Sequence, residues 1–529
     1  MRHSSPRPCR SRVSTLLVVT VAGLLLLPSC RSDDDGADCP PGERERGGVC
    51  VPFGGDPGGD PGPPGEASDV ADGTSGLDVS ESPSVEEDTT SGRSSEDPLW
   101  SGDLPSETSP NPQPGRCPAD QPATTLTGRV TIPSGALPLP DVTVYVPASD
   151  PLPITPGAQC VPCGEEITGN PIVLTETDNQ GRFILRNVPE GDNIPLVIQV
   201  GKWRRIVNVP RVEPCTVTAL PQDLTRLPRN QSEGDIPQFA VTTGGCDAME
   251  CLLRKIGIDD SEFTPEAGGG RVHLFAGNAG TRRYAPSMNG GASFTSAASW
   301  WSNENNLMPY DIVVMSCECN EGTSSKPLSA TTAMRNFANA GGRMFLSHYH
   351  YYWLRGGPDD FQSVATWNNF GENIRSPAMG TIDRDFDKGQ QMADWMFENE
   401  IVDTFGRFEI RDVRASVQTL NEDIATRWAW ITPQCLNLPF IPCPPPVEEQ
   451  PQYISFNTPI GAQPDDQCGR VVHSDIHVSG GDRSSDGSRD GSTEVFFPDG
   501  CRTSELTAQE AALVFMLFDL ARCIVPDKI

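Results

Sequence analysis

The stretch "LSATTAMRNFANAGGRMFLSH", from Leu328 to His348, predicts the fold of the C-terminal half of the chain. Its first part carries small and apolar residues at the spacing of one helix face: Ala330, Ala333, Met334, Phe337 and Ala338. Gly341 follows as a C-cap, and the apolar run "GRMFLSH" has the length of a strand. The stretch therefore predicts a helix that leads directly into a buried strand, and the strand ends at a histidine.

Similar units recur over residues 241–529. We expect strands in "GGGRVHLFAG", "YDIVVMS", "YISFNTP" and "GRVVHSD", and a short helix in "DAMECLLRKIGI". The last helix opens with a capping box from Thr507 to Glu510 and has a buried face of Leu513, Met516, Leu517 and Leu520. Strand–helix–strand units of this length predict a doubly wound, flavodoxin-like α/β domain with right-handed crossovers.

An all-β domain is expected before it, over residues 116–240. The segments "TLTGRVTI", "DVTVYVPA", "PIVLTETD", "GRFILRNV" and "PLVIQVGKWRRIVNV" alternate or run apolar, with turn residues between them. Several short strands at this spacing indicate a β-sandwich. We expect its four cysteines, Cys117, Cys160, Cys163 and Cys215, to form two bridges.

The N-terminus has the features of a bacterial export signal. Four arginines precede an apolar run from Leu16 to Leu27, which is too short for a permanent membrane span. The run ends in "LPSC", which resembles the lipobox of bacterial lipoproteins, in which the cysteine is lipidated. We therefore expect residues 1–30 to be a signal peptide, Cys30 to be lipidated, and the protein to be anchored at the outer membrane or cell surface.

The segment between the expected lipid anchor and the folded domains has a distinct composition. Residues 31–115 are rich in Pro, Gly and Ser and hold 20 acidic residues against 4 arginines, which predicts a disordered tether, interrupted by a small disulfide hairpin from Cys39 to Cys50. The formal net charge of −31 argues against nucleic acid as a partner. Seventeen cysteines fit an oxidising compartment, and removal of Cys9 and Cys30 leaves an odd number, so at least one thiol is free or bridged to another chain.

The six histidines point to a candidate site. Apart from His3 in the signal, each lies in or at the end of an expected strand, with His273 in the first of them. His348 and His350 end one strand, and His473 and His477 flank Asp475 in "VVHSDIHVS". Ligands of open parallel sheets bind beyond the carboxyl ends of the strands, where Cys317, Glu318 and Cys319 also fall. Because residues i and i+2 of a strand share a face, His348 and His350 are expected to converge.

Three interpretations of this constellation remain open. The first is a divalent metal site, zinc by default, with His348, His350 and His477 as ligands and Asp475 or Glu318 nearby. The second is a pocket for a small polar or carbohydrate ligand, in which His348, His350 and His473 form hydrogen bonds and the neighbouring aromatic residues, Tyr349, Tyr351, Tyr352 and Trp353, stack. The third treats the histidines as framework and the aromatic residues as core.

Two parts of the sequence resemble known protein families. The segment "TLTGRVTIPSG…LPDVTVYVP…TDNQGRFILRNVPEGD" resembles the carboxypeptidase regulatory-like domain, a prealbumin-like sandwich that serves as a folding and interaction module. The stretches "YDIVVMSCE", "FANAGGRMFLSHYHYYW" and "GRVVHSDIHVS" resemble the class I glutamine amidotransferase-like fold and its ThuA-like branch. That resemblance implies that Ser347 or His348 sits at the nucleophile elbow and that His477 takes the place of the catalytic histidine.

The sequence departs from the amidotransferase pattern in two places. The elbow carries bulky "SHYHYY" where small residues are expected, and the partner glutamate is not evident, so glutamine hydrolysis is not expected. We expect a cell-envelope lipoprotein that displays a domain binding a small polar ligand or an envelope component. The alternative is a hydrolase or metal-dependent enzyme that uses His348, Asp475 and His477, with Cys317 or Ser347 as a candidate nucleophile.

Overall fold

The protein is described from a computed structural model that covers residues 43–46, 49–52, 117–368, 374–436, 448–478, 494–502 and 505–527. Residues 1–63 and 64–529 form separate units. In the first unit, β1 (Glu43–Arg46) and β2 (Val49–Pro52) make an antiparallel hairpin with Glu45 opposite Cys50. A hairpin was expected here, whereas Cys30, Cys39 and most of the expected tether lie outside the described residues.

The β-sandwich is confirmed, with seven strands in two sheets. One sheet has the order β6 (Arg182–Arg186), β3 (Thr125–Arg129), β9 (Val217–Ala219). The other has the order β5 (Pro171–Glu176), β4 (Thr143–Pro147), β7 (Gly191–Val200), β8 (Trp203–Val212). Alternating side chains from both sheets fill the space between them, among them Leu126, Val144, Leu185 and Ile198. A single helical turn, α1 (Gln222–Thr225), follows β9.

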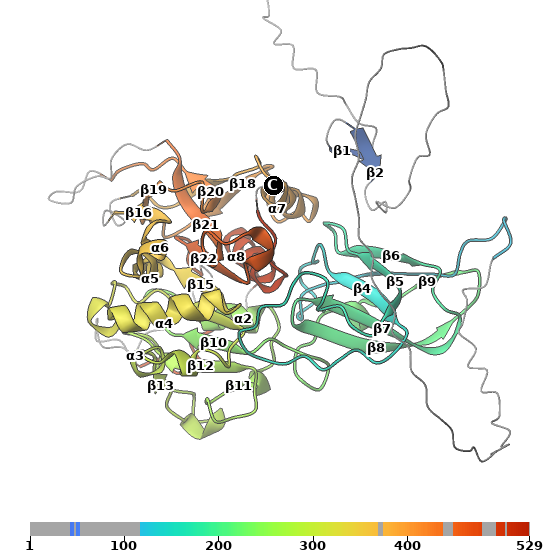
Figure 1. Ribbon diagram of the computed structural model, residues 1–529, viewed down its shortest axis with the longest axis horizontal. Helices are drawn as coiled ribbons and strands as arrows, with labels where there is room; N and C mark the ends of the chain where they lie inside the picture. The colour runs from blue at the N-terminus through green and yellow to red at the C-terminus, as the bar shows by residue number, and fades with distance from the viewer. Residues whose placement is uncertain are drawn as a thin grey trace, which may run out of the picture. The chain divides into compact units, whose positions relative to one another are not determined.

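A large sheet of parallel and antiparallel strands forms the centre of the α/β domain (Figure 1). Its parallel part runs in the order β11 (Phe263–Thr264), β12 (Val272–Ala276), β10 (Phe239–Thr242), β14 (Ile312–Met315), β15 (Arg343–Ser347), β22 (Gly469–Ser474). The antiparallel part continues with β21 (Gln450–Thr458), β20 (Thr426–Ile431), β17 (Ala378–Ile382) and β18 (Arg407–Ile410). The five strands β12-β10-β14-β15-β22 have the flavodoxin-like order 2-1-3-4-5, which has its switch point between the first and third strands.

The first strand of this sheet was not predicted. β10 occupies Phe239–Thr242, so the expected domain boundary at residue 240 falls inside a strand. His273 consequently lies in the second strand, β12, and not in the first. The predicted lead-in helix is α2 (Met249–Lys255), which connects β10 to the chain segment before β12. A four-residue strand that follows Pro237 is too short to show a pattern of its own.

Consecutive side chains of the central strands face two different cores. Val241, Val314 and Phe345 point into one core, which includes α8 (Ala508–Ala521), whereas their neighbours Ala240, Val313 and Leu346 point into another, which includes α4 (Leu328–Asn339). The two helices lie on opposite faces of the sheet (Figure 1). Both were predicted, with the buried faces and the Thr507–Glu510 capping box that the structure shows.

Shorter elements complete the domain. The remaining helices are α3 (Ala297–Trp300), α5 (Tyr352–Arg355), α6 (Asp359–Gln362) and α7 (Asp387–Glu398). A two-residue strand, β13 (Thr295–Ser296), pairs with β12, and β16 (Ala365–Trp367) pairs with β19 (Val417–Leu420) in a separate ribbon. Short 3₁₀ turns include η5 (His348–Tyr351), which follows β15 directly.

The sandwich and the α/β domain share one hydrophobic core. Trp203 of β8 lies 6.1 Å from Phe239 of β10 and 5.6 Å from Phe518 of α8, measured between ring centroids. Lys202 beside it makes a half-buried ion pair with Asp311 at 2.5 Å. The two domains therefore fold against each other as one unit.

Disulfides join the same two domains, which corrects the expected pairing. Cys117 does pair with Cys215 inside the sandwich, but Cys160 pairs with Cys468 and Cys163 with Cys523. The loop that carries "CVPC" lies on the α/β domain, since a Cβ on Gly341 would meet the carbonyl oxygen of Gln159 at 2.0 Å. This contact between distant parts of the chain has no signal in the local sequence.

The corrected pairing can be tested by peptide mapping. In a non-reducing tryptic digest, we expect the peptide Val130–Arg182, which holds both cysteines of "CVPC", to be linked to Cys523–Lys528 and to Trp428–Arg470. Mass spectrometry of the reduced digest gives the separated peptides as the control. A bond between Cys160 and Cys163, or from either to Cys215, would contradict the structure.

Candidate functional site

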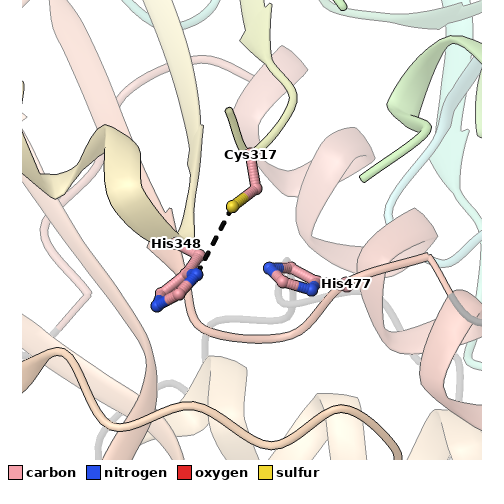
Figure 2. A group of neighbouring side chains, drawn as sticks. All are labelled: Cys317, His348 and His477. Atoms are coloured by element: carbon pink, nitrogen blue, oxygen red, sulfur yellow. Dashed lines mark hydrogen bonds between the residues drawn. The ribbon is translucent and has the colours of Figure 1, made fainter. Parts of the chain in front are cut away.

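Three side chains converge at the carboxyl ends of β14, β15 and β22, which are consecutive strands of the sheet. Cys317 follows β14, His348 follows β15, and His477 lies three residues beyond β22. One ligand atom from each lies within 4.8 Å of the other two, and all three residues are buried. The Sγ of Cys317 is 3.4 Å from Nδ1 of His348, and the two imidazole centroids are 5.3 Å apart (Figure 2). We call these three residues the Cys–His cluster.

The backbone turns sharply at His348. Its φ is +40°, in the left-handed region that only a few per cent of non-glycine residues adopt. β15 ends at Ser347, and the chain enters η5 at this residue. The strained turn directs the imidazole of His348 beyond the edge of the sheet, toward Cys317. Backbone strain of this kind persists only where surrounding contacts hold it, and it concentrates at functional sites.

His350 is not part of this cluster, which corrects the expectation that it shares a face with His348. The two-residue alternation applies to strands, but His348–Tyr351 is a 3₁₀ turn. Nε2 of His350 lies 2.9 Å from the carbonyl oxygen of Ser316, and its Nδ1 accepts a hydrogen bond from Nε1 of Trp353 at 2.9 Å. Both ring nitrogens are therefore engaged, and Trp353 is completely buried among apolar residues. These two residues form part of the framework.

Asp475 and His473 also lie outside the cluster. Both carboxylate oxygens of Asp475 accept hydrogen bonds from Ser416, one from the amide and one from the hydroxyl, each at 2.6 Å. His473 approaches Asp475 at 3.5 Å, and its ring packs edge-on against Tyr351 and Trp367. The predicted catalytic role of Asp475 therefore has no geometric support, because its oxygens point toward Ser416.

Two further residues near the edge are engaged in contacts of their own. Glu318 pairs with Lys326 at 2.5 Å and accepts from the amide of Asn278 at 2.8 Å. Cys319 is bonded to Cys246, which leaves Cys317 as the free thiol within the described part of the chain. A free thiol is one of the two outcomes that the odd cysteine count predicted.

Sequence reasoning missed Asp247, the residue that connects the cluster's two histidine segments. Its Oδ2 accepts a hydrogen bond from Oγ of Ser347 at 2.5 Å, and its Oδ1 accepts from the amide of Val478 at 3.0 Å. Ser347 precedes His348 and Val478 follows His477, so one carboxylate positions the segments that carry both histidines. The sequence gives little signal for Asp247, because the four-residue run "FAVT" that precedes "TGGCD" is too short to show a strand pattern.

Glycines allow the loops at this edge to pack closely. A Cβ on Gly244 would lie 2.2 Å from the carbonyl oxygen of Cys317, and a Cβ on Gly277 would lie 2.0 Å from that of Thr243. Any larger residue at either position would have to displace backbone. The loop after β10 therefore lies directly against the segment that carries Cys317.

Burial keeps all three residues of the cluster neutral. It raises the pKa of the Cys317 thiol to about 12, although the backbone amides of Tyr349 and Cys319 act in the opposite direction. Burial also lowers the pKa of His477 to about 3 and that of His348 well below its usual value, where repulsion from His477 adds to the effect. A protonated thiol is a poor nucleophile, so the structure does not present Cys317 as an activated catalytic cysteine.

Tyr349 is the aromatic residue that lies next to the cluster. Its ring is half-buried and lies 4.1 Å from the imidazole of His348, tilted by 42°. It is the one predicted stacking residue that retains both exposure and contact with the cluster. Tyr351, by contrast, stacks on Trp367 and donates a hydrogen bond to Glu321.

Comparison with known proteins shows a distant likeness in fold. No protein-family model matches the chain, and no curated protein matches it. A solved structure of a putative ThuA-like protein from Bacteroides uniformis is similar, with a TM-score of 0.26 and 11% identity, over 53% of this chain and 90% of that chain. Two cohesin–X-dockerin complexes from Acetivibrio cellulolyticus match with TM-scores of 0.13 and 0.14 and identities of 14% and 15%. They cover 27% and 26% of this chain and 75% and 85% of theirs.

These TM-scores are too low for a site or an activity to be transferred to this chain. Within the part of the chain that the structure describes, no helix is both long enough and apolar enough to cross a bilayer.

The framework role of His350 predicts a pH-dependent contribution to stability. Burial and the nearby Lys326 ammonium lower the pKa of His350 to about 3, against about 6.5 in the unfolded chain. The unfolded state therefore binds a proton first, and stability is lost as the pH falls from about 6.5 toward 3. With chelator present, the free energy of unfolding of the wild type should exceed that of His350→Gln at pH 7.5. This difference should shrink by roughly 2–3 kcal/mol between pH 7.5 and 4.5. The measurement is guanidinium denaturation at each pH. A difference in unfolding free energy between the two proteins that does not change with pH would contradict this role.

Proposed function

We propose that this protein is a cell-envelope lipoprotein whose α/β domain binds one transition-metal ion, zinc by its chemistry, through Cys317, His348 and His477. The observation that carries the proposal is the convergence of one thiol and two imidazoles from three separate elements to within 4.8 Å. Nε2 of His477 supports it further, because this atom is buried and makes no hydrogen bond with the described residues. A buried nitrogen without a partner is costly unless a ligand satisfies it.

The donor set suits zinc in type and in protonation. Zinc takes thiolate and neutral imidazole ligands, and the burial of this cluster already holds both imidazoles neutral. Bonds of about 2.0–2.3 Å place the ligands of a tetrahedral ion roughly 3.3–3.8 Å apart, so the cluster needs movements of only about 1 Å. The Cys317 thiol would give up its proton on binding, since a metal reverses the effect that burial has on its pKa.

Three protein ligands leave one position of a tetrahedral ion open, as in catalytic zinc sites. We propose that the small polar ligand expected from the sequence occupies that position, next to the half-buried ring of Tyr349. Metal-dependent hydrolysis is the second candidate function, and the open position is what favours it. A cysteine hydrolase is disfavoured because the pKa of Cys317 is raised to about 12.

We also propose the family relationships of the two domains. The strand order 2-1-3-4-5 and the strained turn at His348 support a relationship to the ThuA-like branch of the amidotransferase-like fold. The seven-stranded sandwich supports a carboxypeptidase regulatory-like module. The net charge of −31 supports the exclusion of nucleic acid as a partner.

Metal content tests the proposed site. The full-length protein, purified in detergent without chelator, should contain about one zinc ion per chain by elemental analysis. Cys317→Ser and His477→Ala should each lose the metal, and chelator should lower the melting temperature of the wild type but of neither variant.

His273→Gln is the matched control, because it removes a buried imidazole that bonds to Tyr310 away from the cluster. This variant should keep its zinc. Metal-free wild-type protein, or zinc retained in His477→Ala, would refute the site.

Lipidation is tested separately at the N-terminus. Cys30→Ala should move the protein from the membrane fraction to the soluble fraction, because it removes the acyl chains that anchor it. Cys9→Ala changes a cysteine that the mature protein is expected to lack and should leave the protein with membranes. Membrane retention of Cys30→Ala in a fractionation blot would contradict the anchor.

A further inference from the structure

A second concave site lies on the antiparallel half of the large sheet, formed by β17, β18 and β20. Its volume is about 310 Å³, within the range of small-ligand pockets. Its polar and aromatic lining residues are Arg375, Arg407, Trp430, Thr381, Thr432 and Gln434. None of them belongs to the Cys–His cluster, so the two sites are independent.

The strand register arranges three of these side chains in a row. Thr381 of β17 pairs with Arg407 of β18 on one side and with Trp430 of β20 on the other. Their sequence neighbours Ile382, Phe408 and Ile431 are buried on the opposite face of the sheet. A guanidinium, a hydroxyl and an indole therefore lie side by side on the outward face.

The two arginines of this site are available for a ligand. Arg375 and Arg407 are exposed, and no ion pair involves either of them among the described residues. The nearest acid on β18, Glu409, is paired with Arg411 at 2.8 Å. Two further acids beside the strands, Asp383 and Glu449, are both paired with Arg427, which lies on β20. Free guanidinium groups are conspicuous in a chain with a net charge of −31.

We propose that this site binds an anionic saccharide, a chain that contains uronic acid residues. A sugar carboxylate fits a guanidinium group, because guanidinium recognises planar anions with paired hydrogen bonds. The Arg427 guanidinium lies over the Trp430 ring, 5.9 Å from its centroid, so a pyranose ring fits the opposite face of this indole. Sugar hydroxyls fit Thr381, Thr432 and Gln434. Thr432 already donates its hydroxyl proton to the carbonyl oxygen of Glu448, so it faces the ligand as an acceptor. The mixture of charged, aromatic and amide groups distinguishes this site from one that binds only a simple anion.

Calorimetric titration of the full-length protein with trigalacturonate tests the proposal, with its neutral methyl ester and inorganic phosphate as comparison probes. Binding of trigalacturonate should exceed that of either probe. Arg407→Gln and Trp430→Ala should each weaken it about tenfold or more, because each loses a charge-assisted bond or a stacking surface.

The matched control is Arg411→Gln, which removes an exposed arginine two positions along β18 that is already paired with Glu409. It should bind trigalacturonate as the wild type does. Melting temperatures would verify that each variant is folded. Absence of binding to the wild type, equal binding of the methyl ester or of phosphate, or equal losses in Arg407→Gln and Arg411→Gln would each overturn the proposal.

Discussion

The carboxylate of Asp247 is the contact on which the candidate site depends. It follows β10, the first strand of the sheet, and accepts hydrogen bonds from Ser347 and Val478, which adjoin the two histidines of the cluster. These segments are about 130 residues apart in the sequence, and β15 and β22 bring them together as parallel neighbours. Asp247 therefore fixes the two histidine segments relative to each other.

Burial of Asp247 carries a cost that the local hydrogen bonds offset. Desolvation raises its pKa to about 6, while the hydrogen bonds from Ser347, Val478 and Ala248 act in the opposite direction. A buried carboxylate with three donors stabilises one arrangement of the chains around it, since any other arrangement leaves polar groups without partners.

The rest of the edge limits movement in the same place. The Cys246–Cys319 disulfide joins the loop after β10 to the loop after β14. The second of these loops also carries the free Cys317. Gly244 lies so close to Cys317 that no side chain fits between them. Preorganisation of this kind fits a site that holds its ligand atoms in place before the ligand arrives.

Much of this arrangement could be predicted from the sequence, and the exceptions have physical reasons. The helix face of α4 and the apolar run of β15 are local patterns, and the rule that parallel strands present ligands at their carboxyl ends placed Cys317, His348 and His477 at one edge. His350 was misplaced because a 3₁₀ turn replaces the strand after Ser347. That turn is not visible in a run of bulky aromatic residues, which suits a strand equally well.

Other features depend on contacts that no local pattern carries. β10 is only four residues long, so its role as the central first strand, and with it Asp247, became apparent only from its pairing with β12 and β14. The bridges from Cys160 and Cys163 span 308 and 360 residues, and four cysteines near one another in sequence gave no indication of partners so distant.

X-ray absorption spectroscopy at the zinc edge, on protein loaded with one equivalent of zinc, measures directly which atoms coordinate the metal. Zinc bound by the Cys–His cluster should have one sulfur neighbour at about 2.3 Å and two imidazole nitrogen neighbours at about 2.0–2.1 Å. A first shell without sulfur, or with two sulfurs from an opened disulfide, would contradict it.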